Sequence, residues 1–381
     1  MNKTTSMSGW STTLVSIGLY FAAAAVPAQE ADPAALEIIE SLSLRESAEP
    51  IRNHQRWAEP RKVVVAYWEA LGGSKEQFLS EMQAVAGEAE VVLFDLSDPD
   101  VESIKGADVY ISYCSPRVVK NLQNLRWIHS YGVGVDRCLS DSDVRELDFI
   151  MSNNQRLSAP SIAEFALGMA LMLNNNMANY QKAQDQKSWT RSGLRMTSDL
   201  SGKTMLVLGL GGIGTETARR ASAFGMRVIA TRNSSRKGPA FVAKVGLSDE
   251  MYELAGEADF VVNALPLTPT TNGLVDRKFF DALKPGAYYV NVGRGKTTVT
   301  GDLIAALNTG TLAGAGLDVT DPEPLPSDHP LWAAKNVVIT PHIAANSSDS
   351  DRRMLVIARE NLRRYVQGER LLSVVDVERG Y

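Results

Sequence analysis

The sequence predicts an α/β protein with two parallel sheets, each covered by helices. Three observations carry this prediction. Short apolar runs rich in valine and isoleucine recur along the chain and alternate with segments of helical spacing. The alternation begins at Lys62, is interrupted by one long apolar helix over residues 160–173, and starts again at Met205. The composition, with 44% hydrophobic and 22% charged residues, is that of an ordinary folded chain.

The length, charge and cysteine content exclude several classes of protein. The chain has 381 residues, enough for two or three domains. Its net charge of −5 gives no bulk attraction to nucleic acid, so we expect no nucleic-acid partner. Two cysteines, Cys114 and Cys138, cannot build a four-thiolate site, and we expect no metal. We expect both to be free, mostly buried thiols rather than a disulfide, even in an exported protein.

Residues 1–28 have the pattern of a secretory signal peptide. Lys3 is the only charge before Glu30, residues 14–26 are mostly apolar, and small residues precede a cleavage point after Ala28. The apolar stretch is too short for a bilayer span, so no membrane segment is expected in the mature form. We expect a periplasmic or secreted protein if this segment is a true signal peptide. If it is only an N-terminal extension, the protein is cytoplasmic.

The first α/β unit follows residues 29–60, which we interpret as a linker with a short helix over 34–44. An apolar helix over 160–173 then connects the two units, and Ser161 and Glu164 have the spacing of a capping box at its start. The predicted strands of the first unit are 63–67, 91–94, 109–113 and 127–131, and its first helix is 75–86.

A glycine-rich turn opens the second unit. The strand 205–208 is followed at once by Gly209, Gly211 and Gly214 in G-x-G-x-x-G spacing, and then by a helix over 215–224. Gly209 permits the tight turn, Gly211 lets the backbone approach a diphosphate, and Gly214 allows close packing of helix on strand. The free N–H groups of the helix start would hold the diphosphate. This context predicts a Rossmann dinucleotide-binding domain.

The turn after the next strand, 227–231, favours NADP over NAD. An NAD site places a carboxylate about 20 residues after the glycine turn to bind the ribose hydroxyls. Here the strand is followed by Arg232, Ser234 and Arg236, and the first acid is Asp249. Arginines can bind a 2′-phosphate through hydrogen bonds of about 1.5–3 kcal/mol each. We therefore expect NADP as the cofactor, with NAD as the second choice.

Four ordered motifs lie downstream, in segments 265–271, 291–295, 314–323 and 340–345. Together they resemble the motifs of the D-isomer-specific 2-hydroxyacid dehydrogenases. The resemblance covers residues 62–381 and implies two α/β domains with the active site between them: a Rossmann domain inserted into a flavodoxin-like substrate domain. It implies a small 2-oxo acid as the substrate and a second copy of the chain as the partner in a homodimer. The implied domains are 61–157 with 343–381 for the substrate, and 158–342 for the cofactor.

The resemblance implies Arg294, Glu323 and His342 as the catalytic residues. The planar guanidinium of Arg294 suits a substrate carboxylate or carbonyl, and it stabilises charge that grows on the carbonyl oxygen. His342 would donate a proton as hydride arrives, and Glu323 would pair with the imidazole and fix its tautomer. Reduction of a 2-oxo acid needs these groups.

Further contacts are implied for the substrate and the cofactor. The loop 130–136 resembles the family's substrate loop, in which the N–H groups of Val133 and Gly134 would bind the carboxylate. Asp318 matches the position that binds the nicotinamide amide. The remaining cofactor contacts implied are Gly212, Ile213, Pro266 and Thr271. Of the other histidines, His129 is expected to be packed in the interior.

The leading hypothesis is an NADP(H)-dependent reductase of small 2-oxo acids, of the glyoxylate and hydroxypyruvate class. The alternative from another class is an NADP(H)-sensing binding protein of the same fold without turnover, against which the retained catalytic residues argue. A formate dehydrogenase is disfavoured because Pro341 precedes His342, where that branch has Gln. A short 3-phosphoglycerate dehydrogenase stays open, because no motif in residues 61–160 identifies the accepted side chain.

Overall fold

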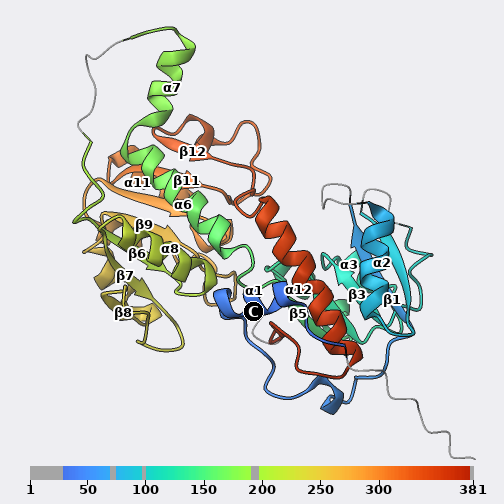
Figure 1. Cartoon of the computed structure of the whole chain (residues 1–381). Coiled ribbons are helices and arrows are strands. Elements are labelled where there is room, and N and C mark those ends of the chain that lie inside the picture. The colour runs from blue at the N-terminus through green and yellow to red at the C-terminus, as the bar shows by residue number, and fades with distance from the viewer. Residues whose placement is uncertain (1–28, 69–73, 97–99, 190–196, 378–381) are drawn as a thin grey trace, which may run out of the picture.

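The computed structural model describes residues 29–68, 74–96, 100–189 and 197–377, so the predicted signal peptide lies outside the described residues. The chain forms two parallel sheets in two lobes (Figure 1). This confirms the predicted fold class. In the described parts of the chain, no helix is both long enough and apolar enough to cross a bilayer.

The first lobe holds a five-stranded sheet in the order β2-β1-β3-β4-β5. Its strands β3, β4 and β5 are buried along their whole length, as expected for a parallel sheet covered on both faces. The strands are β1 (Lys62–Tyr67), β2 (Glu90–Asp95), β3 (Val109–Ser112), β4 (Trp127–Ser130) and β5 (Ile150–Asn153). The helices are α2 (Lys75–Val85), α3 (Pro116–Val119), α4 (Asp136–Leu139) and α5 (Ser142–Arg145).

The second lobe holds a seven-stranded sheet in the order β12-β11-β10-β9-β6-β7-β8. The strand order reverses at β6, and ligands of such sheets bind at the carboxyl ends of the strands beside this point. The strands are β6 (Thr204–Leu208), β7 (Arg227–Thr231), β8 (Lys244–Gly246), β9 (Phe260–Asn263), β10 (Ala287–Asn291), β11 (Leu312–Leu317) and β12 (Val337–Ile339). The helices are α8 (Gly212–Ala223), α9 (Met251–Ala255), α10 (Arg277–Ala282) and α11 (Thr300–Thr309).

Three helices connect the lobes or extend from them. The apolar α6 (Ala159–Asn174) leaves the first lobe and packs against α8 and the second sheet. The C-terminal α12 (Ser348–Val366) returns to the first lobe, where it packs on α2 and on the N-terminal α1 (Pro33–Leu42). The short α7 (Met177–Asp185) continues from α6, projects outward in Figure 1 and has no buried residue.

The prediction of free thiols is wrong, because Cys114 and Cys138 form a disulfide. Cys114 follows β3, and Cys138 lies in α4 after β4. Parallel neighbouring strands end at the same edge of a sheet, so their following segments meet there even though the two cysteines are 24 residues apart. Their Cα atoms are 5.6 Å apart, a separation typical of disulfides.

The predicted capping box of α6 is also wrong. Ser158 is the N-cap, so Ser161 and Glu164 lie inside the helix. Both use their side chains in tertiary contacts instead: the Ser161 hydroxyl lies 2.9 Å from that of Ser347, and the Glu164 carboxylate binds Arg220. These contacts join α6 to the start of α12 and to α8.

His129 is packed in the interior, as predicted. The residue is fully buried in β4, and its ring nitrogens lie 2.8 Å from the Ser152 hydroxyl and 3.1 Å from the Asn154 amide oxygen. The amide nitrogen of Asn361, from α12, lies 3.4 Å away. Burial lowers the pKa of His129 to about 4, so the ring is neutral at physiological pH.

Candidate active site

The candidate site lies where the segments after β4 meet the segments after β10, β11 and β12. The Arg294 loop follows β10 and is fixed by Asn291, whose side-chain oxygen accepts from the Gly293 N–H at 3.0 Å. A Cβ on Gly295 would collide with the backbone of Thr320, so this turn requires glycine. The Arg294 side chain therefore leaves a rigid loop.

Arg294 lies directly on the predicted substrate loop. Its Nε donates to Asp136 Oδ1 at 3.2 Å, and its Nη1 donates to the Gly293 carbonyl at 2.8 Å. A Cβ built on Gly134 would overlap the guanidinium and would lie 2.9 Å from Asp136 Oδ1. Only glycine allows this close approach. The arrangement brings a guanidinium against a loop of backbone N–H groups, which is chemistry suited to a carboxylate.

The substrate loop itself is anchored from the neighbouring strand. Asn153, at the end of β5, donates its amide to the Val133 carbonyl at 2.8 Å. The Val133 side chain is 38% exposed. The loop thus has a fixed backbone next to Arg294 and a side chain that faces outward.

Glu323 and His342 form a hydrogen-bonded pair. His342 Nδ1 lies 2.9 Å from Glu323 Oε1, while the His342 side chain is 44% exposed. Because Nδ1 is engaged, Nε2 is the nitrogen available to exchange a proton with another group. This pairing of a carboxylate with an imidazole is suited to general acid–base chemistry.

The backbone at His342 is held by Asp318. His342 has φ 57°, in the left-handed region, and its N–H donates to the Asp318 carbonyl at 2.8 Å. The buried Asp318 carboxylate accepts from the Thr340 hydroxyl and from the N–H groups of Ile343 and Ala344, at 2.7–3.0 Å. Asp318 therefore fixes the segment that presents His342. Its contact with nicotinamide stays a prediction.

Two residues of α4, to which the sequence analysis gave no role of their own, join these groups. Asp136 binds Arg294, and the next residue, Arg137, places Nη2 3.3 Å from Glu323 Oε1. That carboxylate oxygen is the one that also contacts His342. The only sequence signal is that Asp136 is the last residue of the substrate loop and Arg137 directly follows it.

The glycine turn after β6 has the shape that a dinucleotide diphosphate needs. Gly209 has φ +92°, and a Cβ on Gly214 would collide with the Gly209 carbonyl. A Cβ on Gly211 would meet nothing within 4 Å, so there is open space in front of this residue. The helix α8 begins at Gly212 without a side-chain cap, which leaves N–H groups for an anion. The residues of the glycine turn therefore fit a dinucleotide diphosphate. Ile213 lies in the first turn of α8.

The basic turn after β7 lies beside the glycine turn. Arg232 donates to the carbonyls of Leu210, at 2.9 Å, and Lys237, at 2.8 Å. Arg236 forms an ion pair with Glu250, and Ser234 is exposed. Arg232 thus has backbone partners, whereas Arg236 has a carboxylate partner that a phosphate would have to replace.

Arg156 was missed by sequence reasoning and lies against the same glycine turn. A Cβ on Gly212 would lie 2.9 Å from Arg156 Cγ. Burial and the positive charges of Arg45 and Arg232 lower the pKa of Arg156. No local pattern marks this residue, because it precedes α6 and meets the glycine turn only in the folded chain. The two remaining predicted contacts, Pro266 and Thr271, bind each other through the Thr271 hydroxyl and the Pro266 carbonyl at 2.6 Å.

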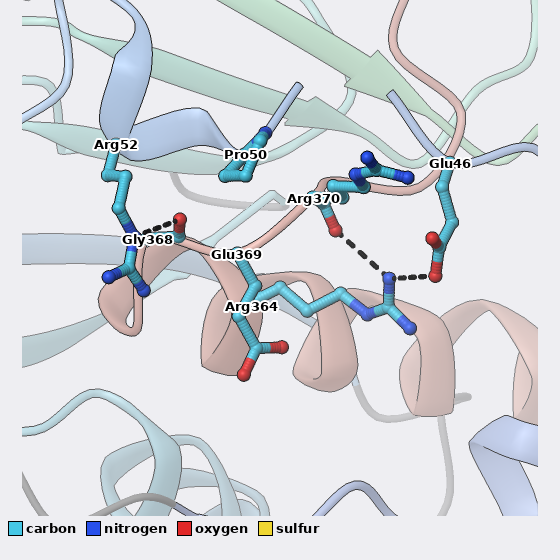
Figure 2. Close-up of a pocket in the computed structure, with 7 residues that line it drawn as sticks. All are labelled: Glu46, Pro50, Arg52, Arg364, Gly368, Glu369 and Arg370. Atoms are coloured by element: carbon cyan, nitrogen blue, oxygen red, sulfur yellow. Dashed lines mark hydrogen bonds and ion pairs between the residues drawn. The ribbon is translucent and has the colours of Figure 1, made fainter. Parts of the chain in front are cut away.

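A hollow of about 330 Å³ on the first lobe is not part of this site. Figure 2 shows Arg364 bonded to Glu46 and to the Arg370 carbonyl, and Arg52 bonded to the Gly368 carbonyl. These bonds tie the segment after α12 to the segment after α1. The charged groups therefore serve the packing of the chain ends.

Comparison with known proteins gives a consistent result. The family model described as "D-isomer specific 2-hydroxyacid dehydrogenase, NAD binding domain" matches residues 167–344. A glyoxylate reductase/hydroxypyruvate reductase from Mus musculus is 34% identical over 303 residues, which cover 76% of this chain and 92% of the relative.

Two solved structures resemble the whole fold. A D-isomer specific 2-hydroxyacid dehydrogenase from Xanthobacter autotrophicus Py2, in complex with NADPH and MES, is 28% identical with a TM-score of 0.70, and the match covers 85% of this chain and all of that one. The NADPH-dependent glyoxylate/hydroxypyruvate reductase from Sinorhizobium meliloti, in complex with NADP and sulfate, is 26% identical with a TM-score of 0.70. That match covers 84% of this chain and 99% of the other.

Proposed function

Because the chain belongs to the D-isomer-specific 2-hydroxyacid dehydrogenase family, an NAD(P)-dependent family of oxidoreductases acting on CH–OH groups, we propose that it is an NADP(H)-dependent reductase of small 2-oxo acids of the glyoxylate and hydroxypyruvate class. One observation carries the proposal. His342 Nδ1 is paired with Glu323 at 2.9 Å, which leaves Nε2 to exchange a proton. Two of the matching proteins are named as glyoxylate/hydroxypyruvate reductases.

Arg294 and the substrate loop would bind and orient the acid. The guanidinium lies on Gly134, so a substrate carboxylate could accept from Arg294 and from the N–H groups of Val133 and Gly134. The same positive charge would stabilise negative charge that develops on the carbonyl oxygen. Asp136 holds the guanidinium in this orientation at 3.2 Å.

His342 would give the proton. When bound, the dinucleotide would supply the hydride chemistry at the carbonyl carbon, in either direction. As the carbonyl double bond opens, Nε2 of His342 protonates the oxygen, so that a 2-oxo acid, a hydride and a proton become one 2-hydroxy acid. Before the proton transfer, Glu323 would stabilise the protonated imidazole. After the transfer, it would keep the neutral ring oriented. His342 is then protonated again from water.

Arg232, Ser234 and Arg236 would give the preference for NADP. Arg236 would exchange its partner Glu250 for the 2′-phosphate, and Arg232 would contribute charge from its place beside the glycine turn. We expect Arg236→Ala to raise KM for NADPH and to leave KM for NADH unchanged. Glu250→Gln, which removes the competing charge and keeps an oxygen for the Leu247 N–H, is the matched control and should not raise KM for NADPH.

The first test is an assay of purified residues 29–381 with NADPH or NADH and each of four acids: glyoxylate, hydroxypyruvate, pyruvate and 2-oxoisocaproate. We expect NADPH to be oxidised faster than NADH, with one of the first two acids as the best substrate. Faster oxidation of NADH would overturn the cofactor preference but not the reductase. Tight NADPH binding without oxidation would overturn the reductase in favour of a sensing protein.

We also propose a homodimer that uses α7. No residue of this helix is buried, Met177 is 52% exposed, Tyr180 is 38% exposed, and Trp189 beyond its end is 92% exposed. Large apolar side chains on a projecting helix are typical of an interface. Light scattering should give twice the chain mass, and Trp189→Ser with Tyr180→Ser should shift the protein to monomer.

We propose export of the protein to an oxidising compartment. The support is the Cys114–Cys138 disulfide, because structural disulfides are typical of periplasmic and secreted proteins. Mass spectrometry of the protein from its own cells should find an N-terminus at Gln29. An intact N-terminus on a cytoplasmic protein would contradict this.

We assign the substrate domain to residues 61–157 with 343–381, and the cofactor domain to 158–342. The assignment is supported by the two sheets, which lie on either side of these limits. Limited proteolysis should cut first near the two crossings and leave the sheets intact.

A further inference from the structure

Three consecutive residues of α4 each have a partner outside the helix. Asp136 binds Arg294, Arg137 binds Glu323, and Cys138 forms the disulfide with Cys114. The first two partners come from the second lobe and belong to the proposed catalytic machinery. The third comes from the first lobe, at the end of β3.

The helix α4 cannot hold this arrangement by itself. It has only four residues, and a helix of one turn is unstable without tertiary support. The side chains of Asp136 and Arg137 face the second lobe, and Arg137 is 79% exposed, so its ion pair with Glu323 alone is weak. The firm attachments to the first lobe are the buried side chains of Cys138 and Leu139 and the covalent bond to Cys114.

The disulfide also fixes the segment on the other side of the substrate loop. Tyr113, next to Cys114, would lie 3.5 Å from a Cβ on Gly132. Its ring centroid is 6.0 Å from that of Tyr131 and 5.9 Å from that of Trp68. The crosslink therefore joins the two segments between which the substrate loop runs.

We propose that the Cys114–Cys138 disulfide is a positioning element for substrate binding: it holds α4 so that Asp136 orients Arg294 and Arg137 contacts Glu323. This inference rests on the proposed function. Reduction of the bond frees α4 from the end of β3 and lets the substrate loop and its two ion pairs shift. The glycine turn lies in the other lobe and has no covalent link to α4, so cofactor binding does not depend on the bond.

The reduction is a two-electron step. Dithiothreitol gives two electrons and two protons to the Cys114–Cys138 bond, which becomes two thiols, and closes to its own cyclic disulfide. Cys138 is buried, whereas Cys114 is partly exposed and offers the sulfur for attack. A thiol titration before and after reduction shows how much of the bond has opened.

The experiment compares the oxidised protein, the reduced protein and the variant Cys114→Ser/Cys138→Ser. For each, KM and kcat are measured with the best 2-oxo acid, and Kd for NADPH is measured by fluorescence. We expect reduction and the double variant to raise KM for the acid about tenfold, since a misplacement of about 1 Å can cost more than this, while Kd for NADPH stays within about twofold. Dithiothreitol should not change the double variant further, and Asp136→Asn should raise KM in the same direction.

The outcomes separate the two proposals. An oxidised protein that turns over no acid overturns the proposed function and this inference with it. An active oxidised protein whose KM is unchanged by reduction and by the double variant overturns this inference alone. Parallel losses of acid binding, NADPH binding and melting temperature would also overturn it, because they indicate a general structural role. If the double variant does not fold, the titrated reduction of the native protein decides.

Discussion

The backbone at His342 adopts a left-handed conformation that costs a non-glycine residue free energy, and it is found where its surroundings enforce it. Here Asp318 holds the backbone in this conformation. The carbonyl and the carboxylate of Asp318 accept from residues on both sides of the turn and from His342 itself. The imidazole is therefore placed by the fold before any substrate arrives, which is the condition for effective acid–base catalysis.

Substitution of His342 tests this role. We expect His342→Ala to lower kcat by about 10²–10⁴-fold, because the proton donor is lost, and to leave Kd for NADPH unchanged. Stopped-flow and fluorescence titration measure the two quantities. His54→Ala is the matched control, since His54 is an exposed histidine of the segment before β1, and it should keep the wild-type kcat. Equal losses in both variants would contradict the assignment.

Two glycines of the substrate loop make a matched pair. A Cβ on Gly134 would lie 2.7 Å from the Arg294 Cζ, whereas one on Gly132 would meet its nearest neighbour at 3.5 Å, an ordinary contact. We expect Gly134→Ala to raise KM for the acid more than tenfold by displacing the guanidinium, and Gly132→Ala to change it little. Steady-state kinetics measure both. A larger effect at Gly132 would show that the loop contacts the substrate differently.

The candidate site was only partly predictable from the sequence. Arg294, Glu323 and His342 lie in ordered motifs, so the resemblance identified them without a structure. Asp136 ends the substrate loop and Arg137 follows it, but neither received a role of its own, because their partners lie in the other lobe, more than 150 residues away along the chain. Long-range partners of this kind cannot be read from local patterns.

At the scale of elements, substitutions in the glycine turn and α8 can distinguish an effect on protein stability from an effect on cofactor binding. A Cβ on Gly214 would collide with the Gly209 carbonyl, whereas a Cβ on Gly211 would point into open space. We expect Gly211→Ala to keep the melting temperature and to weaken NADPH binding, since its methyl group would occupy the space for the diphosphate. Gly214→Ala should lower both. Calorimetry and fluorescence titration measure them.

A glycine far from the turn is the control for this pair. Gly168 lies exposed in α6 with nothing within 4 Å of a Cβ, so Gly168→Ala should raise stability by about 0.5–1 kcal/mol and leave NADPH binding unchanged. Loss of binding in all three variants would mean that the alanine substitutions act through general stability rather than through the turn.

Most elements could be predicted because parallel strands are continuous apolar runs and the long helices have clear periodicity. The strands β5, β8, β9, β11 and β12 were not singled out. Of these, β8 and β12 have only three residues each and carry little pattern. The prediction of a capping box at Ser161 was wrong because the Ser161 side chain makes a tertiary contact instead. The disulfide was missed because the pairing depends on which strands become neighbours.

At the scale of the whole molecule, the buried His129 links the acid stability of the protein to its interior. Its pKa is lowered to about 4 in the folded state from an ordinary value of 6.5, so the unfolded chain binds the proton first as pH falls. The folded state loses stability between about pH 6.5 and pH 4, by up to about 3 kcal/mol. This loss should appear as a slope in the free energy of unfolding against pH.

Urea unfolding at several pH values measures this slope. We expect His129→Gln to have a shallower slope in that range than the wild type, whatever its absolute stability. His54→Gln, at an exposed position, should keep the wild-type slope. Equal slopes in all three proteins would show that His129 does not carry the acid sensitivity.

The chain crosses between the lobes twice, and the two crossings lie together: the Ser158 and Ser350 hydroxyls are 2.6 Å apart, and those of Ser161 and Ser347 are 2.9 Å apart. A segment whose ends meet in this way behaves as a cassette. Recombination could exchange the whole nucleotide-binding lobe through two junctions at a single spot, and so change the electron donor without rebuilding the substrate lobe. An incoming cassette would have to keep a guanidinium for Asp136 and a carboxylate for Arg137. These two ion pairs therefore limit which nucleotide-binding lobes can be combined with this substrate lobe.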